Sequence, residues 1–325
     1  MKRREFIAMI VVGAIVRPRI TQADQVKAIP RVGYVDGPTR SAGIQGLLKG
    51  LHELGYVDGQ NIKLIEQHFA APTVAGMRAA ILAIIREVDV LVVGGTVGGV
   101  AAKSATSEVP VVFISVGAPV DIGLVKSLAE PGGNITGVSF EAAEETYAKR
   151  LQLLTEVVPD LSRVAILAAA GDPNVPFAMA SLKRSAPGLG VSITPIEVKS
   201  ADDLGRAFDE MTRTQMQAVL VISGFLTYTS IKQTCDLALA NHLPSCHGFK
   251  EAVAAGGLIS LGPDLVSLGR QSSRLVDKII RGEHPAHIPV EQPDRYVMSI
   301  NLKTARSLAL IVPPALLARA DELIE

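Results

Sequence analysis

The sequence has no tryptophan, and aromatic residues make up only 4% of its 325 residues. It also has no excess of either charge, since 32 basic residues balance 32 acidic ones. Proteins that bind nucleic acids usually carry a basic excess, and many stack bases on exposed aromatic side chains. The composition therefore argues against a nucleic-acid partner.

Cysteine is scarce as well, because Cys235 and Cys246 are the only two in the chain. They fall in a predicted helix and in the strand predicted to follow it. A helix and its next strand seldom aim their Cβ atoms at each other at disulfide distance. We expect two unpaired, mostly buried thiols, and a disulfide between them stays open as the alternative.

Motifs of catalysis, nucleotide binding and metal binding are lacking too. The glycine-rich stretch 94–99 does not have the G-x-G-x-x-G spacing, and no P-loop or G-x-S-x-G elbow occurs. His284 and His287 are close in sequence, but no cysteine or carboxylate cluster accompanies them. We therefore expect no metal, no cofactor and no enzymatic activity.

The apolar run 7–16 is too short to cross a bilayer, because a spanning helix needs about 20 residues. A basic region precedes it, and this order is typical of an export signal. Residues 3–7, RREFI, also resemble the twin-arginine motif. We expect residues 1–28 to be a Tat- or Sec-type export signal without a lipidated cysteine, and the mature protein to be periplasmic. A buried first strand or helix is the alternative, and Arg17 and Arg19 are unusual in a cleavage region.

From Ile29 onward, short runs rich in β-branched residues alternate with amphipathic segments. Apolar residues of the segment 44–56 recur at three- and four-residue spacing, as on one face of a helix. The run 88–95 is nearly all apolar, as in strands buried on both faces of a parallel sheet. The same alternation starts again at Arg163. Because such alternation gives parallel sheets with helices on both faces, the sequence predicts two similar α/β domains.

The element boundaries follow from these runs and from the glycines that end them. Strands are predicted at 31–35, 61–69, 88–95, 109–116, 163–171, 191–198, 218–224, 243–249, 258–262 and 296–302. Helices are predicted at 44–56, 76–88, 100–106, 175–190, 200–214, 230–242, 250–257, 265–282 and 313–324. We expect the first crossing between the domains near Gly137–Ser139.

Polar residues, glycines and two phenylalanines follow the ends of these predicted strands in both domains. Ligands of open α/β sheets bind beyond the carboxyl ends of the strands, so two facing domains would bring these loops into one cleft. The candidates for ligand binding are Asp36, Gly37, Thr96, Ser115, Gly117, Asp172, Asn174, Ser223, Phe225, Phe249 and Asp264. Taken singly, most of these types are also ordinary turn formers or helix caps, so the pattern is more informative than any one residue.

The same loops lie in stretches that resemble a known family over nearly the whole chain. These stretches are LHELGYVDGQNI, VPVVFISVGAPVDIGLVKSLAEPGGNITGVSF, GGLISLGPDL and INLKTARSLALIVPPALLARADELIE. They are similar to ABC-transporter substrate-binding proteins of the type 1 periplasmic binding protein fold, in the group that includes tryptophan- and tyrosine-type binding proteins.

The resemblance implies two doubly wound parallel-sheet domains joined by three hinge crossings, with a small ligand between them. The first lobe would comprise 29–138 plus 259–286, and the second 139–258 plus 287–325. Carried over by position, the ligand-binding residues would be Asp36, Gly37, Thr96, Ser115, Gly117, Ser139, Asp172, Asn174 and Asp264. The chain departs from the family in the loop DGPTR, which places a carboxylate and Arg40 at the cleft edge, and in AAGDPN, which has few asparagines.

The function that the resemblance implies is that of a monomeric solute-binding component of an ABC-type importer. It would close on a small polar or amino-acid-like ligand and deliver it to the permease and its ATPase. Two alternatives remain at this point: a ligand sensor of the same fold that feeds a membrane receptor, and an enzyme that uses the same cleft.

Overall fold

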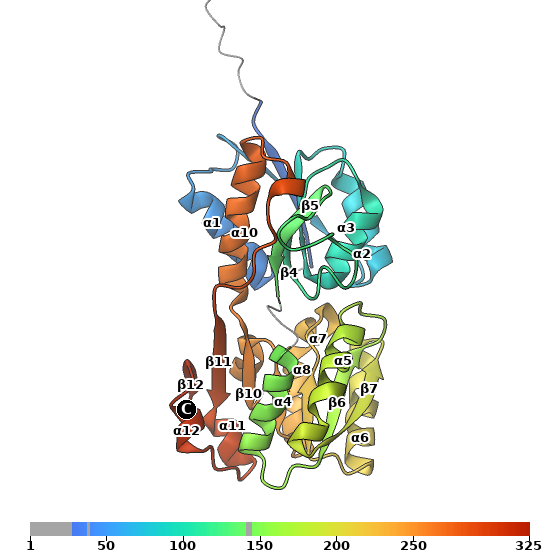
Figure 1. Ribbon diagram of the computed structural model, residues 1–325, viewed down its shortest axis with the longest axis vertical. Helices are drawn as coiled ribbons and strands as arrows, with labels where there is room; N and C mark the ends of the chain where they lie inside the picture. The colour runs from blue at the N-terminus through green and yellow to red at the C-terminus, as the bar shows by residue number, and fades with distance from the viewer. Residues whose placement is uncertain (1–27, 38–39, 141–144) are drawn as a thin grey trace, which may run out of the picture.

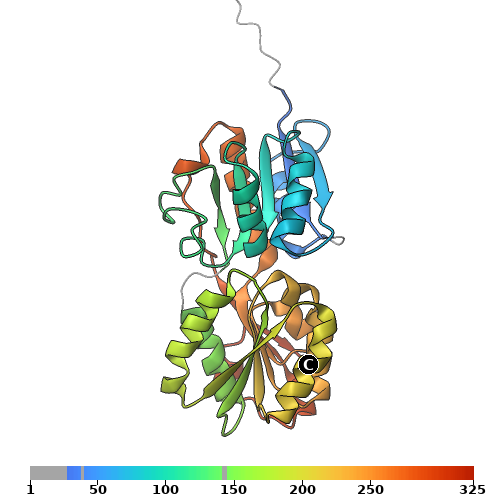
Figure 2. The ribbon, with the colours of Figure 1, turned by 90° about the vertical axis from the view of Figure 1, so that its right-hand side faces the viewer.

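The computed structural model describes residues 28–37, 40–140 and 145–325, which form two lobes (Figures 1 and 2). The expected export signal, 1–28, lies outside the described residues except for its last position. Within the described ranges, no helix is both long enough and apolar enough to cross a membrane.

The first lobe is built on a parallel sheet with the strand order β2-β1-β3-β4-β5. Helices α1 and α10 cover one face of this sheet, and α2 and α3 cover the other (Figure 1). The strands are β1 (Arg31–Asp36), β2 (Lys63–His68), β3 (Val90–Gly94), β4 (Val111–Val116) and β5 (Ile135–Ser139). The helices are α1 (Ala42–Glu53), α2 (Val74–Ile84), α3 (Gly95–Ala105) and α10 (Leu265–Ile280).

The second lobe is built on a sheet with the order β12-β11-β10-β9-β8-β6-β7, in which only the β10–β11 pair is antiparallel. Its strands are β6 (Arg163–Ala169), β7 (Ser192–Val198), β8 (Ala218–Val221), β9 (Ser245–His247), β10 (Ile259–Pro263), β11 (Tyr296–Asn301) and β12 (Glu322–Ile324). Its helices are α4 (Glu145–Val157), α5 (Val175–Ser185), α6 (Leu204–Arg213), α7 (Phe225–Thr229), α8 (Ile231–Ala240), α9 (Lys250–Ala254), α11 (Leu302–Ser307) and α12 (Pro314–Leu317).

The two sheets repeat one strand order. The spatial order β7-β6-β8-β9-β10 in the second sheet corresponds, strand by strand, to β2-β1-β3-β4-β5 in the first. Apolar residues from α4 and α5 pack on one face of the second sheet, and residues from α6 and α8 pack on the other. The prediction of two similar doubly wound parallel-sheet domains is therefore confirmed.

The crossings between the lobes differ from the expected boundaries. Strand β10 lies in the second sheet, between β9 and β11, whereas we expected 259–286 in the first lobe. Leu258 and Ile259 are fully buried in the second lobe's core, so the chain leaves that lobe only at the start of α10. Likewise, Gly137–Ser139, where we expected the first crossing, belongs to β5 of the first sheet, and the crossing follows it.

The third crossing also falls later than expected. The segment 288–291 stays beside β5, where Thr136 Oγ1 donates to the carbonyl of Ile288 and the Ser139 amide donates to the carbonyl of Glu291. The chain enters the second sheet only at Tyr296, which pairs with Pro263. Residues 287–291 thus belong to the first lobe.

The secondary structure predicted from the sequence was wrong or incomplete in two further regions. The segment 313–324, predicted as one helix, forms the short helix α12 and then β12, which extends the sheet beside β11. Asp321 favours this path, because its amide donates to the Met298 carbonyl and its carboxylate accepts from the Met298 amide. No element was predicted between 117 and 162, where β5 and α4 occur.

Helices α1 and α10 pack closely because small residues face each other across their interface (Figure 1 shows them side by side). A Cβ atom on Gly269 would overlap the carbonyl oxygen of Gly43, and one on Gly46 would overlap that of Val266. These are backbone atoms, which cannot rotate out of the way. The glycines therefore hold α10, which is remote in sequence, against the first lobe.

We expect Gly269→Ala to lower the free energy of unfolding, since overpacking a close contact costs about 1–3 kcal/mol. Gly205→Ala in α6 is the matched control, because no atom lies within 4 Å of its added Cβ. This control should leave stability unchanged or raise it by up to about 1 kcal/mol, the helix propensity of alanine. Thermal and urea denaturation of both variants tests the contact, and equal effects would contradict it.

Candidate ligand-binding site

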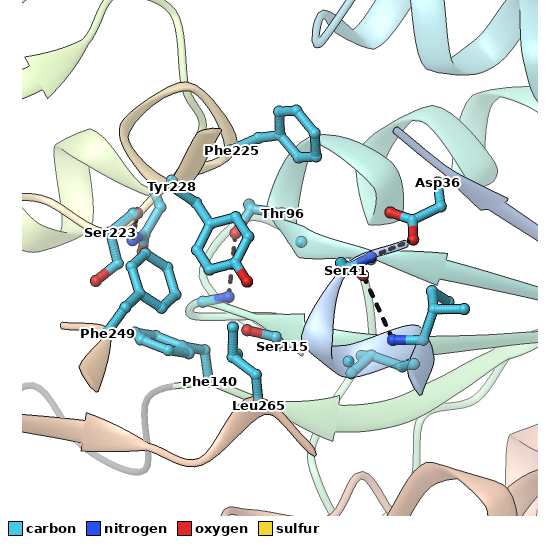
Figure 3. A pocket seen from close by; sticks show the side chains of 18 of the residues that line it. Asp36, Ser41, Thr96, Ser115, Phe140, Ser223, Phe225, Tyr228, Phe249 and Leu265 are labelled. Atoms are coloured by element: carbon cyan, nitrogen blue, oxygen red, sulfur yellow. Dashed lines mark hydrogen bonds between the residues drawn. The ribbon is translucent and has the colours of Figure 1, made fainter. Parts of the chain in front are cut away.

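A cavity lies between the two lobes, at the carboxyl ends of the parallel strands of both sheets (Figure 3). It contains about 730 Å³ of space free of protein atoms, part of it open to solvent. Loops after β1, β3 and β4 of the first lobe and after β6, β8 and β9 of the second line the cavity.

One wall of the cavity is aromatic. The rings of Phe140 and Phe249 lie with their centroids 5.2 Å apart, and Tyr228 meets Phe249 edge-on at 5.0 Å. Phe225 also lines the cavity, as do the aliphatic side chains of Ile44, Met77 and Leu265. Such walls favour a ligand with an apolar or aromatic body, which is a less polar site than the sequence suggested.

Asp36 places a carboxylate at the opposite side of the cavity from Phe140 and Phe249 (Figure 3). It is the last residue of β1 and is only 5% exposed. Its carboxylate accepts hydrogen bonds from the Gly37 amide at 2.9 Å and from the Ser41 amide at 2.7 Å. Burial raises the pKa of Asp36 above its ordinary value, although these two hydrogen bonds oppose the shift. A cationic group of a ligand would stabilise the ionised form.

The ends of β3 and β4 supply hydroxyl groups and the amino end of a helix. Strand β3 runs directly into α3, so that Gly94, Gly95 and Thr96 all line the cavity. Thr96 Oγ1 accepts from the Gly117 amide at 3.1 Å, which leaves its own proton free to donate. Ser115 lies at an irregularity in the pairing of β4 with β5 and has a φ of 65°. Backbone strain of this kind occurs preferentially at ligand sites.

Asn174 forms the polar part of the cavity wall in the second lobe. Its Nδ2 donates to the Tyr147 hydroxyl at 2.9 Å and to the Ser223 carbonyl at 3.1 Å. The Asp172 carboxylate accepts a hydrogen bond from the backbone amide of Asn174 at 2.9 Å. Burial raises the pKa of Asp172 above its ordinary value. A cluster of hydrogen-bond acceptors therefore lies on this side of the cavity.

The lobes touch each other across the cavity, so the structure is a closed form. Phe69, after β2, meets Phe225 of α7 edge-on, with ring centroids 4.8 Å apart. The Tyr228 hydroxyl, also from α7, lies near the Ala42 amide at the start of α1. Helix α7 thus contributes both to the cavity wall and to the contact between the lobes.

Eight of the twelve predicted site residues line this cavity, namely Asp36, Thr96, Ser115, Gly117, Asn174, Ser223, Phe225 and Phe249. The other four lie outside its lining. Gly37 donates to Asp36, and Asp172 lies behind Asn174. Ser139 belongs to β5 and is bonded to Glu291. Asp264 caps α10 and forms an ion pair with Lys250 at 2.5 Å.

Several cavity residues escaped the sequence analysis. Phe140 follows β5, a strand that was not predicted. Tyr228 lies three residues after Phe225 on α7, and this helical spacing could have indicated it. Ile44 and Leu265 lie in the first turns of the amphipathic helices α1 and α10. An apolar residue in such a helix normally indicates core packing alone.

The two cysteines and the pair His284 and His287 are not among the residues that line the cavity. Cys235 and Cys246 are unpaired and buried, as expected, and burial raises the pKa of both thiols to about 12. The described residues include no group of three histidine, cysteine or acidic side chains that could hold a metal ion. The His284 side chain instead accepts a hydrogen bond from the Ala286 amide.

Two similar parallel-sheet lobes that close over a cavity at their strand ends define a bilobal ligand-binding protein. The comparison with protein families agrees: residues 29–324 match the model of the ABC transporter substrate binding proteins, and the chain belongs to this family. Its members are substrate-binding proteins and not enzymes. The chain is 25% identical over 288 residues to a tyrosine-binding protein of Clostridioides difficile (strain R20291), covering 89% of this chain and 82% of that protein.

Solved structures show the same type 1 periplasmic binding protein fold. A conserved domain protein from Vibrio cholerae superposes with a TM-score of 0.85 at 27% identity, covering 91% of this chain and 99% of that one. The ABC domain in complex with L-Trp from Streptococcus pneumonia gives 0.84 at 22% identity, with the same coverage. A ligand-free, open substrate binding protein from Clostridium difficile gives 0.65 at 21% identity, again with coverage of 91% and 99%.

We expect Ser115→Gly to raise the free energy of unfolding by up to about 1 kcal/mol, because a left-handed conformation costs a residue with a Cβ about 1–2 kcal/mol. Ser115→Ala also removes the hydroxyl but keeps the Cβ, so it should give no such gain. Chemical denaturation of the two variants and the wild type checks the difference. A glycine variant no more stable than the alanine variant would mean that Ser115 is unstrained.

Proposed function

We propose that the protein is the extracytoplasmic solute-binding component of an ABC-type importer, and that its ligand is an amino acid with an apolar or aromatic side chain. One observation carries this proposal: the cavity combines the buried carboxylate of Asp36 with the rings of Phe140, Tyr228 and Phe249. An ammonium group on an apolar body matches that combination. Relatives described as a tyrosine-binding protein and as a complex with L-Trp support it.

The ligand's two charged groups would have separate partners. Its ammonium would pair with Asp36, and its carboxylate would accept hydrogen bonds from the hydroxyls of Thr96 and Ser115 and from the amino end of α3. The described residues that line the cavity include no lysine or arginine. A ligand carboxylate would therefore depend on neutral donors and on the helix dipole.

Binding would act through the hinge. The contacts Phe69–Phe225 and Ala42–Tyr228 join the lobes only when they are closed. A ligand held by both lobes would shift the population toward that form, which would then dock on the permease and its ATPase. Deletion of the gene should then abolish high-affinity uptake of the ligand, whereas a sensor of the same fold would leave uptake intact.

The site of action would be the periplasm, reached through a Tat- or Sec-type signal in residues 1–28. The N-terminal sequence of the protein isolated from the periplasm tests this part. A mature N-terminus close to residue 29 would support export, and an intact Met1 would contradict it.

We expect the wild-type protein to bind L-tyrosine or L-tryptophan in isothermal titration calorimetry. Asp36→Asn should weaken the binding about tenfold or more, since hydrogen bonds to charged groups contribute about 1.5–3 kcal/mol. Asp121→Asn changes an exposed aspartate outside the cavity and should leave affinity unchanged. Absence of binding to any aromatic or aliphatic amino acid would refute the proposed ligand class.

The affinity should also depend on pH through Asp36. Burial raises the pKa of this carboxyl above its ordinary value of 3.8, so it takes up a proton at a higher pH than a typical aspartate. Because only the ionised form pairs with an ammonium group, affinity should fall as the pH drops through the raised pKa. Binding in that range should release a proton, measurable as a dependence of the calorimetric heat on the buffer's ionisation enthalpy. Asp36→Asn should abolish both effects.

A further inference from the structure

The side-chain amide of Asn174 is held in one orientation. The Ser223 carbonyl can only accept hydrogen bonds, so the amide atom that faces it at 3.1 Å must be Nδ2. The Tyr147 hydroxyl, at 2.9 Å, is the second partner of the same nitrogen. Both partners belong to the second lobe. Asn174 Oδ1 consequently points away from them, and its role as an acceptor is fixed.

This oxygen has no hydrogen-bond partner among the described residues, although it is buried. Asn174 is 2% exposed and lines the cavity. Oδ1 lies against Gly117 of the first lobe, where a Cβ atom would overlap it. Burying an acceptor without a donor is unfavourable. The closed form therefore contains an unsatisfied acceptor at the boundary between the lobes.

The neighbourhood of Oδ1 defines what could satisfy it. The Asp172 carboxylate accepts a hydrogen bond from the backbone amide of Asn174 and so belongs to the same loop. The Gly117 amide, across the lobe boundary, already donates to Thr96 Oγ1. An anionic ligand group would be repelled by this arrangement of acceptors. An N–H or O–H group of a ligand could instead donate a hydrogen bond to Oδ1.

We propose that Asn174 Oδ1 is the atom with which the second lobe recognises a hydrogen-bond donor on the ligand. This inference rests on the proposed function and adds to it the residue that determines specificity. The donor is either the ammonium group of an amino acid or a donor on its side chain, such as a phenol O–H. In both cases, a ligand without that donor leaves Oδ1 unsatisfied on closure, and its binding is weakened.

The experiment compares a ligand series across matched variants by isothermal titration calorimetry. L-Phenylalanine lacks the phenol O–H of L-tyrosine, and 3-(4-hydroxyphenyl)propionate lacks its ammonium group. The variants are Asn174→Ala, which removes Oδ1, and Tyr147→Phe, which removes one partner of Nδ2 but leaves the Ser223 carbonyl to orient the amide. Circular dichroism and thermal melts establish that each variant is folded.

We expect the wild-type protein to bind at least one of the two analogues about tenfold to a hundredfold more weakly than L-tyrosine. In Asn174→Ala that ratio should shrink at least fivefold, and the analogue whose ratio shrinks identifies the donor. Tyr147→Phe should keep the wild-type ratio. A role of Asn174 in folding alone would weaken all ligands equally and leave the ratios unchanged.

Unchanged ratios in a folded Asn174→Ala that still binds L-tyrosine would overturn the inference and leave the proposed function standing. Failure of the wild type to bind any member of the series would overturn both. If Asn174→Ala does not fold, Asn174→Ser replaces it, because its hydroxyl is too short to reach the position of Oδ1. The ratios of analogue affinity to L-tyrosine affinity in Asn174→Ser then test the inference in the same way.

Discussion

The closed contact between the lobes is the constraint on which the site depends. Each sheet positions its own loops, but the cavity is enclosed only because the carboxyl ends of the two sheets face each other. Side chains from several elements make that contact: Phe69 meets Phe225, Tyr228 lies near the start of α1, and Asn174 lies against Gly117. A Cβ atom at position 117 would overlap Asn174 Oδ1, so glycine there permits this close approach.

Closure also has an electrostatic cost that an empty cavity cannot offset. In the closed form the Asp36 carboxylate is desolvated, which raises its pKa, and Asn174 Oδ1 has no donor among the described residues. Both penalties favour the open form when no ligand is present. A ligand that supplies a cation to the first lobe and a donor to the second removes them together. Ligand affinity and closure are then two aspects of one equilibrium, because the same hydrogen bonds determine both.

The parts of this architecture that could be predicted are those that local pattern determines. Strand and helix periods predicted both sheets except β5 and β12, and the rule that parallel sheets bind ligands at their carboxyl ends led to Asp36, Ser115 and Asn174. Partners in space are not encoded in such patterns. The run at β10 reads as a strand in either lobe, and only its pairing with β9 and β11 assigns it to the second. Phe140 was missed because the strand before it, β5, was not predicted, and Tyr228 because its helical spacing from Phe225 was not used.

Arg150 connects the hinge to this cavity. It is fully buried in the second lobe, and its Nε donates to the Leu261 carbonyl of β10 at 2.7 Å, just before the chain crosses back to the first lobe. Its guanidinium also stacks on the rings of Phe140, where the first crossing begins, and of Tyr147, the partner of Asn174. The planar guanidinium of Arg150 therefore contacts residues at two crossings, Leu261 and Phe140, and also Tyr147, which orients Asn174. The positions of Phe140 in the aromatic wall and of Asn174 therefore depend on the geometry of the hinge, although these two residues are far apart in sequence.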